Sequence, residues 1–242
     1  MNLVEFSNGF DTLVDSYRRF KDFDNKEIPD SIEFDEYEKS LYLTKAQESL
    51  VVTLYNGKNH YGDTFEASEE MRRNLDSLIK TKVLESSDSI DVDEKLSEYS
   101  KVFVLPSDLM FITLEQIKFN DKSLGCYDGS IANVQPIKQD EYEKVRNNPF
   151  RGPTRYRALR LDYGKVESNN TVEIISKYNF SAYTIRYIKK PSPIILENLP
   201  NDITINGIGN ATECELNPIL HNAILESAVL MALRAKGINT GK

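Results

Sequence analysis

Apolar residues recur at helical spacing near both ends of the chain and alternate with polar residues in its middle. Over residues 2–20, 34–56 and 67–83, hydrophobic side chains return every three or four positions, which predicts three amphipathic helices. Between residues 99 and 195, short alternating runs are separated by turns, which is typical of an antiparallel meander and not of a parallel sheet with crossover helices.

The alternating runs predict six strands and one short helix. Pro191 and Pro193 should end the last strand, because proline cannot donate a hydrogen bond inside a sheet. The expected strands cover residues 102–105, 111–119, 131–137, 157–163, 171–178 and 182–189, and the expected short helix covers residues 139–147.

The closing segment, residues 217–237, is predicted to be the most apolar helix. Asn217 caps it, Pro218 occupies the first helical position, and Gly237 ends it. Because its apolar positions spread beyond one narrow face, we expect its own chain or a neighbouring subunit to cover it. Its candidate subunit-packing residues are Ile219, Leu220, Ile224 and Met231.

These patterns together predict an α+β fold, in which a helical bundle from the N- and C-terminal helices carries a β-rich antiparallel insertion. We expect residues 1–83 to form an N-terminal helical part and residues 84–98 an acidic linker loop. Residues 99–195 would form the β-rich insertion. Residues 196–242 would return the chain and pack the C-terminal helix on the N-terminal helices.

Charge and cysteine content narrow the functional classes. The 242 residues include 30 basic and 38 acidic side chains, and the net charge of −8 argues against a general nucleic-acid-binding surface but not against a local basic patch. Cys126 and Cys214 lack CxxC spacing and are expected to be reduced thiols. Polar residues interrupt the closing helix and no basic–apolar leader is present, so we expect neither a membrane span nor a signal peptide.

No combination of residues in the sequence supports catalysis. The motifs of P-loop nucleotide binding, serine hydrolases and zinc proteases are missing from it. His60 and His221 have no cysteine or carboxylate at ligand spacing, so we expect them at the surface or its boundary. Asp88, Asp91 and Asp93 lack the glycine and glutamate of a calcium-binding loop. We therefore expect no enzymatic activity, no metal and no cofactor.

Residues 144–161 concentrate positive charge and contain no acidic residue. Their cationic side chains are Lys144, Arg146, Arg151, Arg155, Arg157 and Arg160. The planar guanidinium of arginine can bind either phosphates or carboxylates in a bidentate manner. These six residues are therefore candidates for a subunit interface or a DNA-facing surface. Pairing with this protein's own surplus acids, within a subunit or across to the next, is the interpretation that we favour.

Beyond residue 33 the chain carries an ordered series of short stretches. They are Tyr42-Leu43-Thr44-Lys45-Ala46-Gln47, Leu105-Pro106-Ser107-Asp108-Leu109, Val134-Gln135-Pro136-Ile137, Asn148-Pro149-Phe150, Tyr187-Ile188-Lys189-Lys190-Pro191-Ser192-Pro193, and Cys214-Glu215-Leu216 followed by His221. This series resembles the head–tail connector proteins of tailed bacteriophages, specifically the adaptor or ring proteins of crAss-like phages.

The resemblance implies a structural virion protein that forms a ring in the phage neck below the portal, connects capsid to tail and leaves a channel for DNA. The implied partners are the portal protein, other neck and tail ring proteins, the DNA in the channel, and further copies of the chain in a dodecameric ring. The resemblance also implies that the protein is made in the host bacterial cytoplasm. The alternative is a DNA-binding or nucleic-acid-processing accessory protein that uses residues 144–160.

Overall fold

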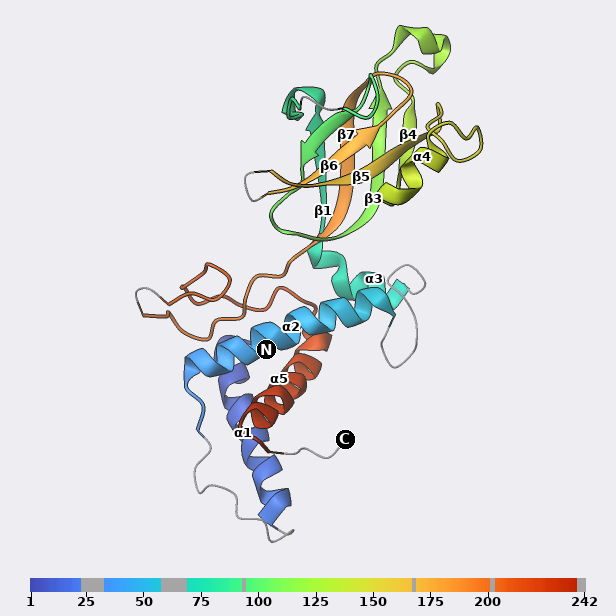
Figure 1. The fold of residues 1–242 in the computed structure, drawn as a ribbon. Helices are drawn as coiled ribbons and strands as arrows, with labels where there is room; N and C mark the ends of the chain where they lie inside the picture. Colours follow the sequence, from blue (N-terminus) through green and yellow to red (C-terminus); the bar gives the residue numbers. More distant parts are fainter. Residues whose placement is uncertain (23–32, 58–68, 93–94, 167–168, 201–202, 239–242) are drawn as a thin grey trace. The chain divides into compact units, whose positions relative to one another are not determined.

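The computed structural model describes residues 1–22, 33–57, 69–92, 95–166, 169–200 and 203–238, and the chain divides into two compact units (Figure 1). The helical unit comprises Met1–Leu78 and Lys190–Lys242, and the sheet unit comprises Ile79–Lys189. His60 and the first two residues of the expected third helix lie outside the described residues.

Three long helices pack against one another in the helical unit. Its helices are α1 (Leu3–Asp22), α2 (Glu36–Asn56), α3 (Glu69–Leu75) and α5 (His221–Ala235), with 3-10 turns at Asp76–Leu78 and Pro218–Leu220. Both α1 and α2 contact α5, and fully buried Phe6, Phe10 and Ile224 belong to this core. The side chain of Asp35 caps α2 by accepting a hydrogen bond from the backbone N–H of Glu38.

An irregular segment covers residues 190–200 and 203–217, and buried polar side chains of α2 hold its first part in place. Ser40 Oγ accepts a hydrogen bond from the backbone N–H of Leu196 at 3.0 Å. Gln47 Nε2 donates one to the carbonyl oxygen of Ser192 at 2.8 Å. These side chains make hydrogen bonds with backbone groups of the irregular segment, which has no strand or helix to pair them. This explains why polar residues occupy the buried face of α2.

The sheet unit is one curled seven-stranded sheet with the order β1-β7-β3-β4-β5-β6-β2 (Figure 1). Its strands are β1 (Ile79–Glu85), β2 (Lys101–Val104), β3 (Leu109–Phe119), β4 (Ile131–Pro136), β5 (Arg157–Val166), β6 (Asn169–Ile175) and β7 (Phe180–Lys189). The main core cluster includes Phe103, Phe119 and Tyr183. A second, smaller cluster joins Leu159 and Leu161 of β5 to the short helix α4 (Tyr142–Val145).

The expected helical bundle with an antiparallel insertion is wrong. The chain is a mixed α+β protein whose main regular feature is the curled sheet, and its helices share their unit with the irregular segment. The sheet is not purely antiparallel, because β4 and β5 pair in parallel. A parallel pair needs a long crossover, and residues 137–156, which contain α4, supply it.

The expected third helix is also wrong beyond residue 78. Residues 79–85 form the edge strand β1, in which Ile79 pairs with Ile188 and Glu85 with Ala182 along the whole length of the strand. The apolar positions up to Ile79 continue a helical spacing, but pairing with β7 overrides that local signal. The expected acidic loop contains a 3-10 turn at Ser86–Asp88 and a β-bridge between Ile90 and Val102.

Candidate interaction surface

Two loops come together at one end of the sheet, where β4 and β5 begin. One covers residues 120–130 between β3 and β4, and the other covers residues 146–156 before β5; together they form what we term the loop surface. The guanidinium of Arg155 lies 4.4 Å from the ring centre of Tyr127 and 4.6 Å from that of Tyr156. These cation–π contacts join the two loops.

The loop at residues 146–156 is held by its own backbone. Asn148 Oδ1 accepts hydrogen bonds from the backbone N–H groups of Phe150, at 2.8 Å, and Arg151, at 3.2 Å. The guanidinium of Arg157 donates to the carbonyl oxygens of Phe150 and Gly152. A Cβ atom at Gly152 would lie 2.7–2.9 Å from three backbone oxygens, so only glycine fits there.

The loop at residues 120–130 depends on Asp121. Its carboxylate accepts hydrogen bonds from the backbone N–H groups of Ser123, at 2.9 Å, and Asn179, at 3.0 Å. Hydrogen bonds from Ser123 and from the Asn179 backbone lower the pKa of Asp121 below its ordinary value. The loop therefore presents Tyr127 from a fixed position.

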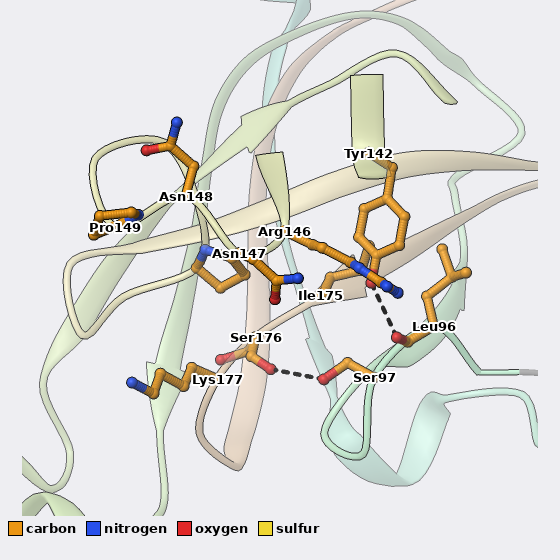
Figure 2. A pocket seen from close by; sticks show the side chains of 11 residues that line it. Leu96, Ser97, Tyr142, Arg146, Asn147, Asn148, Pro149, Ile175, Ser176 and Lys177 are labelled. Carbon is orange, nitrogen blue, oxygen red and sulfur yellow. Dashed lines mark hydrogen bonds between the residues drawn. The ribbon is translucent and has the colours of Figure 1, made fainter. Parts of the chain in front are cut away.

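A cavity of about 600 Å³ opens beside the loop surface (Figure 2). Figure 2 shows Arg146, Asn147 and Lys177 among the side chains around it. Tyr142 Oη donates a hydrogen bond to the carbonyl oxygen of Leu96 at 2.9 Å, which ties α4 to the end of the acidic stretch at residues 84–98. With two cationic side chains and the amides of Asn147 and Asn148 on its wall, the cavity suits a carboxylate or another polar acceptor.

The six predicted cationic residues lie in different environments. Lys144, Arg146, Arg151 and Arg155 are exposed. Arg146 Nε lies 3.2 Å from Glu143, and Arg151 lies 4.0 Å from Glu141. Such exposed pairs stabilise a protein little, so these two arginines can exchange their partners for others. Arg157 is half-buried, and its guanidinium binds the loop backbone.

Arg160 lies inside the curled sheet. Its Nη1 donates a hydrogen bond to Glu115 at 2.7 Å, and the hydroxyl of Tyr183 donates to the other oxygen of the same buried carboxylate. Burial disfavours the charged form of Arg160 and lowers its pKa, but the carboxylate of Glu115 outweighs this effect, so the pKa is raised. The pKa of Tyr183 is raised, mainly by burial and further by the neighbouring carboxylate of Glu115. Arg160 therefore offers little surface to a partner.

The candidate residues of the closing helix also separate into two groups. Leu220 and Ile224 are buried inside the helical unit, whereas Ile219 is 74% exposed and Met231 is half-buried. Only Ile219 and Met231 retain surface for contact with another subunit.

The expected surface position of His221 is wrong. Its side chain is buried at 5% exposure, and its ring centre lies 5.2 Å from that of Phe6. Its Nε2 lies 3.1 Å from the carbonyl oxygen of Leu216, and its Nδ1 lies 2.8 Å from the Met1 amine. Both ring nitrogens therefore have partners inside the protein, which stabilises the buried position.

Within the described ranges, no group of three histidine, cysteine, aspartate or glutamate side chains is placed to hold a metal ion. Among the described helices, none is long and apolar enough to span a membrane.

Comparison with known proteins identifies the family. The family model described as "Phage tail ring protein 3/4" matches residues 1–242. The chain belongs to this family. It is 45% identical over 242 residues to Ring protein 3 of Bacteroides phage crAss001, and the aligned region covers 100% of this chain and 99% of that protein. It is 34% identical over 244 residues to Ring protein 4/5 of the same phage, with 97% and 93% of the two chains covered.

The resemblance to crAss-like ring proteins is therefore confirmed. A phage tail ring protein is a structural component of the virion tail, and its name implies oligomeric assembly and a non-enzymatic role. In this ring protein, the loop surface contains three exposed aromatic residues that sequence reasoning did not combine: Tyr127, Phe150 and Tyr156. Tyr127 is remote from Arg155 in the chain, so the sequence could not show their contact. Phe150 could have been noticed, because it lies between Pro149 and Arg151 in the predicted loop.

Proposed function

We propose that this ring protein forms a dodecameric ring in the phage neck below the portal, where it connects the capsid to the tail and leaves a channel for DNA. The observation that carries the proposal is the match to the tail ring protein family over the whole chain. A closed ring of identical copies needs two different, complementary surfaces on each copy. The loop surface is a candidate for one of them.

The charge of the chain supports a channel that DNA passes through. DNA binding strengthens with the number of phosphates that a protein neutralises, so a strongly basic wall would retain DNA. The net charge of −8 is the opposite of what such retention requires. We propose that the ring guides the DNA without holding it.

Co-assembly with the portal tests this proposal. The purified ring protein would be mixed with the portal protein from the same genome, and native mass spectrometry and electron microscopy would give the mass and symmetry of the complex. We expect one copy per portal subunit. No complex, at concentrations well above those of assembly, would contradict a position next to the portal. Salt-sensitive DNA binding by the free chain would instead favour a DNA-binding accessory protein.

A further inference from the structure

We infer that an aromatic–arginine cluster on the loop surface binds the helical unit of the next copy in the ring. The cluster consists of Tyr127, Phe150, Arg155 and Tyr156, and the inference rests on the proposed ring. Phe150 is 85% exposed, Tyr156 61% and Tyr127 43%. Tyrosine, phenylalanine and arginine are enriched in protein–protein interfaces, and tyrosine and arginine are frequent among the residues that dominate binding.

The cluster is held in a conformation ready for binding. The guanidinium of Arg155 contacts the rings of both Tyr127 and Tyr156, which restricts its side chain before a partner arrives. Among the residues that the structure describes, no carboxylate lies within ion-pair distance of Arg155. Gly152 and Arg157 fix the loop that carries the cluster. A cationic group already ordered loses less conformational entropy on binding.

The two units carry opposite charge. The helical unit contains 13 basic and 22 acidic residues, a formal charge of −9, and the sheet unit contains 17 basic and 16 acidic residues, a charge of +1. An exposed arginine of the sheet unit therefore finds its complement on the helical unit. A head-to-tail ring requires two different, complementary surfaces on each copy, and here the two units would supply one each.

One hollow on the helical unit fits such an arginine. It has a volume of about 360 Å³ and is lined by Asp11, Asp15 and Glu33, by the apolar side chains of Val14 and Phe34, and by Lys39. Carboxylates at an apolar floor complement a guanidinium flanked by aromatic rings.

The carboxylates of this hollow do not all have the same role. Lys39 Nζ lies 2.7 Å from Asp11 and 2.9 Å from Glu36, so this buried lysine pairs with those two carboxylates. Asp15 and Glu33 are exposed, and they are the carboxylates that we assign to Arg155 of the next copy.

The environments of the five arginines among the six cationic residues favour a protein partner over DNA. DNA affinity depends on many cations that are free to neutralise phosphates. Here Arg157 binds loop backbone, Arg160 is inside the sheet, and Arg146 and Arg151 have carboxylates of their own chain beside them. Arg155 stacks on two tyrosines, an arrangement that suits one specific contact.

Charge exchange tests the inference in the full chain, with assembly on the portal measured by native mass spectrometry. Arg155→Glu and Asp15→Lys should each raise the concentration needed for half-assembly by about tenfold or more, because each places like charges opposite one another. A mixture of the two variants should assemble like the wild type, because each variant chain then faces a complementary neighbour. Lys165→Glu is the matched control, because it makes the same charge change at an exposed site near the end of β5. It should assemble normally.

The outcomes separate the inference from the proposed function. Normal assembly by Arg155→Glu and by Asp15→Lys would overturn the inference and leave the ring standing. Normal assembly with a loss of salt-sensitive DNA binding in Arg155→Glu would overturn it in favour of a DNA contact. Failure of the wild type to form any multi-copy assembly would overturn both. Circular dichroism of each variant would establish that it is folded.

Discussion

Arg160 on β5 donates a hydrogen bond to Glu115 on β3, although β4 lies between these strands in the sheet. The Nη1–Oε2 distance is 2.7 Å, and Tyr183 on β7 donates to the same carboxylate. Three strands are thus joined by one buried carboxylate inside the curled sheet. A carboxylate in such a position requires its partners, because an unpaired buried charge is costly.

Loss of the arginine should therefore destabilise the sheet unit. We expect Arg160→Met to lower the free energy of unfolding by about 3–5 kcal/mol, because Glu115 stays buried without its counter-charge. The double variant Arg160→Met/Glu115→Gln should recover most of this loss, since no charge remains and the amide oxygen can still accept the hydrogen bond from Tyr183. Urea unfolding followed by far-UV circular dichroism measures both. Equal losses in the single and double variants would contradict the explanation.

The stability of the helical unit should depend on pH through His221. Burial lowers the pKa of His221 below 6.5, so between the folded and unfolded pKa values the unfolded chain binds more protons. Its contribution is complete above pH 6.5 and falls below it, by at most about 1.4 kcal/mol per pH unit. His221→Gln should lose less stability than the wild type between pH 7 and pH 5 in urea unfolding. Parallel losses in the two proteins would rule out His221 as the cause.

Two glycine substitutions should differ sharply although each adds one methyl group. A Cβ atom at Gly152 would meet backbone oxygens at 2.7–2.9 Å, whereas one at Gly9 on α1 would meet the flexible end of Leu225 at 2.8 Å. We expect Gly152→Ala to cost about 1–3 kcal/mol of stability. Gly9→Ala should cost less, because alanine favours a helix by about 1 kcal/mol. Thermal unfolding compares them, and hydrogen exchange should rise at residues 146–156 in Gly152→Ala alone.

The two cysteines should react with thiol reagents at different rates. Cys126 is exposed in the loop that carries Tyr127, whereas Cys214 is half-buried and burial raises its pKa. Because the thiolate is the reactive form, we expect maleimide to label Cys126 at least about tenfold faster. Mass spectrometry of the labelled chain, with Cys126→Ser as the control, gives both rates. Faster labelling of Cys214 would contradict its placement.

Elements with a strong local pattern were predictable from the sequence. The helices α1, α2 and α5 and the strands from β2 to β7 lie close to their expected residues, because their periodicity matches the faces that they bury. The edge strand β1 was not predictable in this way, since only its pairing with β7 distinguishes it from the end of a helix. The same holds for the parallel pairing of β4 with β5.

Contacts between remote residues limited the prediction of the site. The sequence drew attention to residues 144–161, but it did not show that Arg157 and Arg160 would bind inside their own unit. It also could not show that Tyr127 would lie against Arg155. His221 looked polar and exposed because its partners, Phe6 and Leu216, become neighbours only in the folded unit.

The pairing of Ile79 with Ile188 has a consequence for the gene as well as for the fold. The first and last strands of the sheet unit are neighbours, so the ends of this unit lie about 5 Å apart. One uninterrupted stretch of coding sequence specifies the whole sheet, and its two junctions meet at adjacent positions. Exchange of that stretch between related genes would therefore replace the sheet and its loops as one piece, while the sequence of the helical unit is inherited unchanged.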